Sequence, residues 1–215
     1  MNKLEKRAYS FEIRASEENG IGILTGRPIV YDSPTDLGFF SEMIDKGALD
    51  GADLRDVRFL VNHDTSMIPL ARSRRNNENS TMHFTPDSEG LSLDWVKLDI
   101  GNNADARALY SAVQRGDISG MSFMFSVDDE VWDDLDSEHP TRHITKIGSI
   151  VELSAVTFPA YQDTEINARS KEALDSARTA LEKARQLSVR SVETDNSNEL
   201  ELLKAKTLIL GGKNA

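Results

Sequence analysis

The sequence predicts a mainly β domain with peripheral helices (α+β), built as a closed or partly open β-barrel of about seven strands and followed by a helical C-terminal tail. Two observations predict this. Short segments with strand patterns follow one another between turn signals, and only one or two helical patterns interrupt them. The aromatic residues that can fill a core all lie at or before Tyr161.

The strand patterns begin near the N-terminus. Tyr9, Phe11 and Ile13 alternate with polar residues, at the period of a half-buried strand. The later strand candidates are short apolar or alternating segments: Ile21–Leu24, Arg58–Asn62, Thr81–Phe84, Leu91–Leu98, Met121–Val127, Arg142–Ile147 and Val151–Phe158. Turn signals separate them, among them Asn19-Gly20, Ser33-Pro34, Pro86-Asp87 and Glu89-Gly90. This spacing favours a barrel or sandwich over an alternating α/β fold.

One helix is strongly indicated, over about residues 103–115. Its apolar residues recur on one face, Asn102 or Asn103 can cap its start, and Gly116 can end it; that face consists of Ala106, Leu109, Tyr110 and Val113. A shorter helix is predicted over Phe39–Lys46.

The composition changes near residue 166, which predicts a domain over residues 1–166 and a helical extension over residues 167–215. Residues 1–166 carry a net charge of −13 and residues 167–215 a net charge of +2. The extension has Leu174, Ala177, Leu181 and Ala184 at helical spacing, and a second short helical run from Leu200 to Leu208. Such narrow apolar stripes do not support isolated helices, so the extension is expected to dock on an acidic surface or to be mobile.

Composition also excludes several classes of function. The 215 residues carry a net charge of −11, with 36 acidic and 25 basic side chains, which disfavours nucleic acid as a partner and leaves proteins. The absence of cysteine excludes disulfides, thiolate metal sites and a cysteine nucleophile, and indicates a reducing cytoplasm. No apolar run exceeds three residues, so neither a membrane span nor a signal peptide is expected.

Three residues on different predicted strands could carry chemistry. His63 follows a buried strand, Ser122 is a small polar residue in a strongly apolar strand, and Glu152 is an acid within the most apolar strand of the chain. Each also has a purely structural interpretation: a turn histidine, a serine paired across an edge strand, and an exterior glutamate. Together, a serine, a histidine and an acid are the parts of a nucleophile, its base and the group that orients the base.

The other histidines do not suggest a metal site. His139 and His143 have a spacing of four residues, but Pro140 between them breaks a helix and no third ligand type is near, so both are interpreted as loop residues. No cofactor or metal is expected.

Four motifs together resemble a known family. They are Phe40-Ser41-Glu42-Met43-Ile44 with Gly47-Ala48-Leu49; Val61-Asn62-His63-Asp64 with Leu70-Ala71-Arg72; Gly116-Asp117-Ile118-Ser119-Gly120-Met121-Ser122-Phe123; and the segment from Val151 to Tyr161. In this order, over roughly residues 8–166, they resemble the prohead maturation proteases of tailed bacteriophages, distant relatives of the herpesvirus assembly proteases.

The resemblance implies a β-barrel serine endopeptidase with His63 as general base and Ser122 as nucleophile. The glutamate of the last motif, Glu152, is our choice for the third member of the catalytic triad. Arg72 is a candidate residue for stabilising the oxyanion or binding the substrate. One departure concerns Met124, where many relatives have a glycine, which affects the expected specificity.

The same resemblance implies a role in phage capsid maturation. Such enzymes act inside the immature capsid in the host cytoplasm, where they cut a scaffold protein, or the scaffolding segment of the major capsid protein, and themselves. Those proteins are the expected partners, a homodimer is compatible with the sequence, and the 167–215 extension could direct co-assembly before self-cleavage. Two alternatives stay open: a non-catalytic scaffold or capsid-assembly protein with the same barrel, and an unrelated binding domain.

Overall fold

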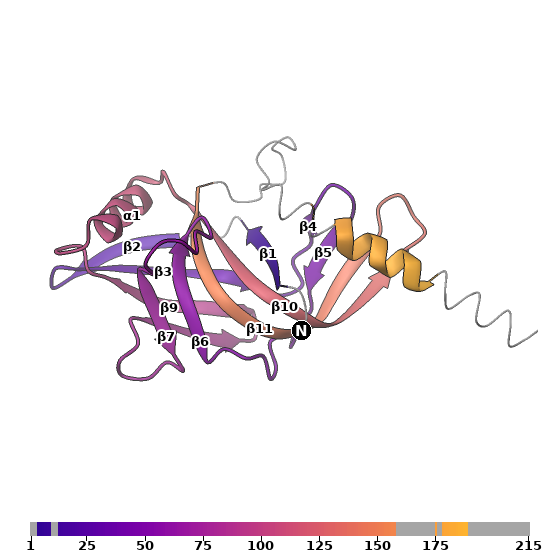
Figure 1. Ribbon diagram of the computed structural model, residues 1–215, viewed down its shortest axis with the longest axis horizontal. Coiled ribbons are helices and arrows are strands. Elements are labelled where there is room, and N and C mark those ends of the chain that lie inside the picture. Colours follow the sequence, from indigo (N-terminus) through magenta and orange to yellow (C-terminus); the bar gives the residue numbers. More distant parts are fainter. Residues whose placement is uncertain (1–3, 10–12, 158–174, 176–177, 189–215) are drawn as a thin grey trace, which may run out of the picture. The chain divides into compact units, whose positions relative to one another are not determined.

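The computed structural model describes residues 4–9, 13–157, 175 and 178–188 (Figure 1). The chain consists of two compact units, Met1–Ser176 and Ala177–Ala215. In the second unit, residues 178–188 form a helix that includes Leu181 and Ala184, as their spacing predicts. The predicted boundary near residue 166 and the helical run from Leu200 to Leu208 lie outside the described residues. No described helix is long and apolar enough to cross a membrane.

The first unit is mainly β and contains two sheets. The seven-stranded sheet contains β1 (Leu4–Tyr9), β4 (Thr35–Asp36), β5 (Ser41–Ile44), β6 (Asp56–Val61), β7 (Ala71–Arg74), β10 (Gly120–Asp133) and β11 (Thr141–Val156). The four-stranded sheet has the order β2-β3-β9-β8, formed by β2 (Ile13–Glu18), β3 (Ile21–Val30), β9 (Gly90–Leu98) and β8 (Met82–Asp87).

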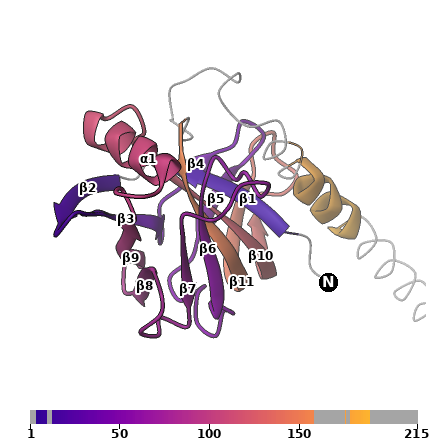
Figure 2. The ribbon, with the colours of Figure 1, turned by 60° about the vertical axis from the view of Figure 1, so that its left-hand side comes forward.

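The two sheets share one core, and they do not close into a single barrel. Apolar side chains from both sheets and from α1 (Ala104–Arg115) form one buried cluster. Figure 2 shows the four-stranded sheet beside β6 and β7 of the larger sheet. The prediction of a closed barrel is therefore wrong, because the hydrogen-bonded pairing divides into two separate sheets. The sequence patterns identify strands but not which sheet each strand joins.

Strand β11 organises the larger sheet. Along one edge it pairs antiparallel with β10 over nearly its whole length, and this pairing contains several register shifts. Along its other edge, its first part pairs parallel with β5 and its last part pairs parallel with β6. The sequence suggested two strands, Arg142–Ile147 and Val151–Phe158, which are one continuous strand as far as Val156. His143, interpreted as a loop residue, also lies in this strand.

Two predicted helices have different outcomes. Helix α1 is confirmed: the Asn103 side chain accepts hydrogen bonds from two backbone N–H groups at its start, and Gly116 ends it in the left-handed conformation. The helix predicted over Phe39–Lys46 is wrong, because Ser41–Ile44 form strand β5 with burial that alternates residue by residue. Apolar pairs spaced by three and four residues misled the prediction, since a short apolar run fits either period.

Candidate active site

The turn after β6 holds His63 in an unusual backbone conformation. Asn62 and His63 have φ angles of 51° and 58°, in the left-handed region that is uncommon for residues other than glycine. The turn is held against the end of β11. The Asn62 side-chain amide donates to Thr157 Oγ1 at 3.0 Å and accepts from the Thr157 backbone N–H at 2.9 Å, and the His63 backbone N–H donates to Ser154 Oγ at 3.2 Å. The surrounding structure thus fixes the direction of the imidazole.

Ser122 and Glu152 lie on the adjacent strands β10 and β11. Ser122 pairs in register with Ser154, and Glu152 with Met124. Paired residues share a face of the sheet, so Ser122, Glu152 and Ser154 lie on the same face. Met121, Phe123 and Phe125 point to the opposite face and are buried in the core. The alternation in the sequence therefore separates the core face of β10 from its functional face.

The structure brings His63, Ser122 and Glu152 together. His63 Nε2 lies 2.5 Å from Ser122 Oγ, and His63 Nδ1 is hydrogen-bonded to Glu152 Oε1. The second Glu152 oxygen, Oε2, accepts a hydrogen bond from Ser154 Oγ at 2.6 Å. The His63 side chain is 13% exposed and that of Glu152 is 2% exposed, so the imidazole and the carboxylate interact with little screening by water.

Ser122 has a second contact that the sequence did not suggest. Its Oγ donates to the backbone carbonyl of Arg7, at 2.6 Å, because β1 pairs with β10 and places Ala8 opposite Ser122. The hydroxyl has one proton, so it donates either to Arg7 or to His63 at a given moment. Ser122 is fully buried in this conformation, and a peptide can reach it only after a rearrangement.

The side chain of Arg7 belongs to a cluster of charges that also contains Glu5, Glu42, Arg142 and the partly exposed Glu130. The Glu42 carboxylate bridges both arginines: its two oxygens bind Arg7, and Oε2 also accepts from Arg142 at 2.8 Å. Arg142 donates to Glu5 at 2.8 Å and is hydrogen-bonded to Glu130 as well. The cluster fixes β1 beside β10 and β5.

Three members of this cluster, Glu5, Arg7 and Arg142, have shifted pKa values. Burial alone would raise the pKa of Glu5, but hydrogen bonds and charge from Arg142 and Arg7 outweigh it and hold that pKa below 4.5. Burial alone would lower the pKa of Arg7, and the adjacent Glu42 and Glu5 carboxylates raise it instead. Glu5 and Arg7 therefore stay ionised near neutral pH, each beside a group of opposite charge.

Arg72 lies apart from these three residues. It is on β7, where its guanidinium donates to both carboxylate oxygens of Asp56, at 2.6 and 2.9 Å, and it forms no hydrogen bond with His63, Ser122 or Glu152.

The sequence analysis did not identify Ser154, which donates a hydrogen bond to Glu152. Its position two residues after Glu152 in a strand was the available signal, because residues two apart share a face.

An apolar cavity opens beside the His63 turn. It has a volume of about 380 Å³ and lies between that turn and α1, with Val61, Met67, Leu109 and Ile118 among its lining residues. Asn62 and Asp64, which flank His63 in the sequence, also line it. A cavity of this size could hold an apolar side chain of a bound polypeptide next to the imidazole.

The arrangement has the parts of a hydrolase that works through a nucleophile. A serine hydroxyl lies within hydrogen-bond distance of one imidazole nitrogen, and a buried carboxylate is hydrogen-bonded to the other. Searches of curated proteins and of solved structures gave no match. Residues 9–178 match the family model of the caudovirus prohead serine protease. This match covers most of the chain, which therefore belongs to the caudovirus prohead serine protease family.

Proposed function

We propose that this chain is a serine endopeptidase of phage capsid maturation with Ser122 as nucleophile, His63 as general base and Glu152 as the orienting acid. The observation that carries the proposal is the continuous hydrogen-bonded path from Ser122 Oγ through both nitrogens of His63 to Glu152. These side chains come from β10, the turn after β6, and β11, so the fold rather than local sequence assembles them.

The proposed reaction follows from this geometry. Ser122 Oγ attacks the scissile carbonyl carbon while His63 Nε2 takes the hydroxyl proton, and Glu152 stabilises the imidazolium through Nδ1–H. The tetrahedral intermediate collapses when the imidazolium gives its proton to the leaving amine, which leaves an acyl-Ser122 ester. A water molecule, deprotonated by His63, then attacks the ester, and the acid product leaves as Ser122 regains its proton.

The proposed reaction requires a particular protonation state of His63. Only a neutral imidazole can accept the Ser122 proton. The hydrogen bond from Ser154 leaves Glu152 Oε2 occupied and Oε1 directed at His63, which favours the tautomer with the proton on Nδ1.

The family supports capsid-related partners and a location inside the procapsid. We propose that the substrates are a scaffold protein, or the scaffolding segment of the major capsid protein, and this chain itself, cut inside the immature capsid in the host cytoplasm. Self-cleavage would remove the 167–215 extension once it has served co-assembly with scaffold helices. Neither a metal nor a cofactor enters this mechanism.

The test is the Ser122→Ala variant of the full chain, with Ser126→Ala as a control on the same strand. Ser126 forms a hydrogen bond with Ser149 and does not contact His63. We expect Ser122→Ala to lower peptide cleavage by about 10⁴-fold or more, and to give a full-length chain by mass spectrometry where the wild type is trimmed. Trimming that continues unchanged in Ser122→Ala would show that another residue is the nucleophile.

A further inference from the structure

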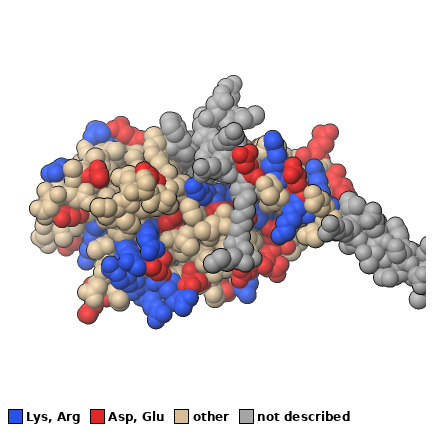
Figure 3. All heavy atoms as spheres, in the orientation of Figure 1, with Lys and Arg blue, Asp and Glu red and all other residues tan. Residues whose placement is uncertain are grey.

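A hollow lined by arginines lies on the larger sheet. It has a volume of about 580 Å³ and is formed by β6, β7 and the residues Ser149, Ile150 and Val151 of β11, directly before Glu152. Figure 3 shows Lys and Arg side chains gathered over β6 and β7. The hollow is lined by Arg55, Arg72, Arg74 and Arg75 and by two acids, Asp53 and Asp56, so it is positive although the chain is negative.

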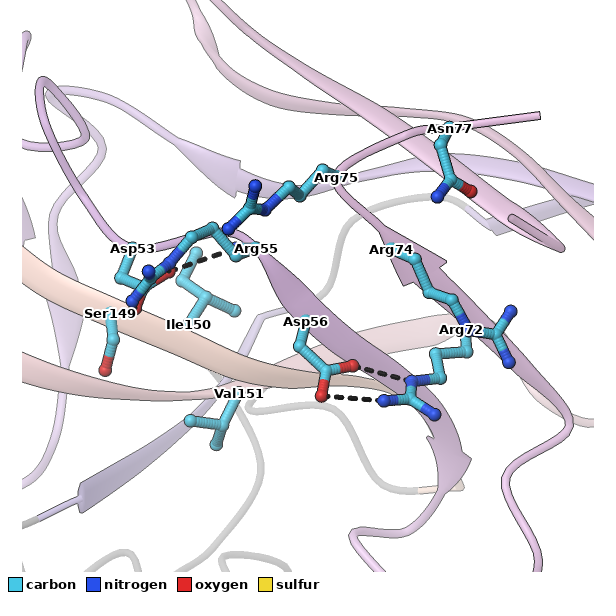
Figure 4. A pocket seen from close by; sticks show the side chains of 10 residues that line it. All are labelled: Asp53, Arg55, Asp56, Arg72, Arg74, Arg75, Asn77, Ser149, Ile150 and Val151. Carbon is cyan, nitrogen blue, oxygen red and sulfur yellow. Dashed lines mark hydrogen bonds and ion pairs between the residues drawn. The ribbon is translucent and has the colours of Figure 1, made fainter. Parts of the chain in front are cut away.

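Two of these arginines form ion pairs within the hollow and two do not. Arg55 binds Asp53 and Arg72 binds Asp56, as Figure 4 shows. Hydrogen bonds from Arg55 lower the pKa of Asp53 to about 2, so that carboxylate stays paired at neutral pH. Arg74 and Arg75 have no carboxylate within salt-bridge distance in the described part of the chain; the Arg74 guanidinium donates to the backbone carbonyl of Asn79, at 3.0 Å. Their charge is available for a ligand.

The turn that carries Arg75 is held firmly. Arg75 and Asn76 have φ angles of 58° and 49°, which cost free energy in residues other than glycine unless neighbours fix them. Here the Asn76 side chain donates to the Phe84 carbonyl, at 2.7 Å, and accepts from Ser73 Oγ, at 3.0 Å. The turn therefore presents Arg75 at the hollow with little freedom of the backbone, which reduces the entropy lost on binding.

The hollow and the proposed active site share a face of the sheet. Arg72 pairs in register with Arg58, and Arg58 with Glu152, so these three side chains lie on the same face. Arg74 lies on that face too, opposite Asp56. The residues of β6 that pair with Arg72 and Arg74 are Arg58 and Asp56. They precede His63 by about five and seven residues, a distance of roughly 15–25 Å at about 3.3 Å per residue. An extended peptide crosses that distance with about the same number of residues.

We propose that this hollow is a subsite for acidic side chains of the polypeptide substrate, about five to seven residues from the scissile bond. The inference rests on the proposed endopeptidase function. Guanidinium groups bind carboxylates with two parallel hydrogen bonds, so Arg74 and Arg75 fit aspartate or glutamate side chains. A polypeptide is favoured over a nucleic acid because the proposed active site acts on peptide bonds, and because a net charge of −11 disfavours binding to a chain of phosphates.

The binding test uses the full chain with Ser122→Ala, which prevents turnover, and fluorescein-labelled hexaglutamate followed by anisotropy at low ionic strength. We expect the added pair Arg74→Glu and Arg75→Glu to weaken binding by about tenfold or more, since two exposed ion pairs are lost and replaced by repulsion. The matched control is Lys46→Glu with Arg107→Glu, two exposed cations elsewhere on the first unit, which should leave binding within about twofold. Hexalysine should not bind.

The cleavage test uses the catalytically competent chain and a peptide library made from a proteome digest, with cut sites read by mass spectrometry. We expect aspartate and glutamate to be enriched about five to seven residues from the cut, and the enrichment to disappear in the variant with Arg74→Glu and Arg75→Glu but not in the control variant.

The outcomes separate the two proposals. If no peptide is cut, the endopeptidase proposal fails, and hexaglutamate binding still decides whether the hollow is an acidic subsite. Cleavage without acidic enrichment, equal hexaglutamate binding by the two paired variants, or tighter binding of a single-stranded oligonucleotide than of hexaglutamate would each overturn the subsite.

Discussion

Replacing Glu42 by glutamine should destabilise the first unit strongly, because this carboxylate is shared by two buried arginines. Glu42 is fully buried, and the side chains of Arg7 and Arg142 are each only 2% exposed. Glutamine keeps the shape but removes the charge, so the two guanidinium groups must share the remaining carboxylates of Glu5 and Glu130. Breaking one partner of a buried ion pair costs about 3–5 kcal/mol.

That free energy can be measured by urea unfolding. With a slope of about 2 kcal/mol per molar urea, we expect Glu42→Gln to lower the unfolding midpoint by about 1.5–2.5 M at pH 7. The matched control is Asp87→Asn, which removes an ion pair with Arg27 whose side chains are 27% and 35% exposed. An exposed pair contributes about 1 kcal/mol or less, so the control midpoint should fall by about 0.5 M at most.

The same substitution should also affect the proposed active site. Arg7 accepts the hydrogen bond from Ser122 through its backbone carbonyl, and the Glu42 carboxylate is the main anchor of its side chain. Weaker anchoring of β1 should raise hydrogen exchange at the backbone amides of Leu4–Tyr9. If Glu42→Gln shifts the midpoint no more than Asp87→Asn and leaves that exchange unchanged, the cluster does not hold β1 and the reasoning is refuted.

Three further predictions test other parts of the structure. Ser154→Ala should lower the rate of peptide cleavage by about tenfold or more and change the pH profile of that rate, because Glu152 loses a hydrogen bond. Ser154→Thr should restore part of the rate and part of the profile. An unchanged pH profile in Ser154→Ala would refute the role of Ser154 in positioning Glu152. Stability conferred by Glu5 should be full above about pH 4.5 and decline as pH falls through its lowered pKa, so Glu5→Gln should flatten the acid limb of unfolding midpoint against pH. Gly90→Ala should cost about 2–4 kcal/mol in urea unfolding, because the new Cβ would lie 2.0 Å from the Ile29 carbonyl oxygen at a φ of +143°; a cost below 1 kcal/mol would contradict this.

The sequence was sufficient for features that depend on local patterns. The residues that cap and end α1, Asn103 and Gly116, lie directly before and after it in the sequence, so the bounds of this helix could be predicted closely. The alternation of apolar residues around Ser122 identified it as facing away from the core. His63, Ser122 and Glu152 could be chosen because each residue type was unusual for its strand environment, and the motif order connected them.

Features that depend on tertiary pairing could not be predicted. Glu42 lies 35 residues from Arg7 and 100 from Arg142, so no local pattern shows that one carboxylate bridges both arginines. Whether the strands form one closed barrel or two sheets depends on which edges meet, and strand periodicity carries no information on that.

The most direct test of the proposed mechanism is covalent labelling of the full chain with a fluorophosphonate, with the modified residue identified by mass spectrometry. The account predicts labelling at Ser122 that is abolished by His63→Ala, reduced by Glu152→Gln and retained in Ser126→Ala. Labelling of a different serine, or labelling of Ser122 that persists unchanged in His63→Ala, would contradict the proposed roles of His63 and Ser122.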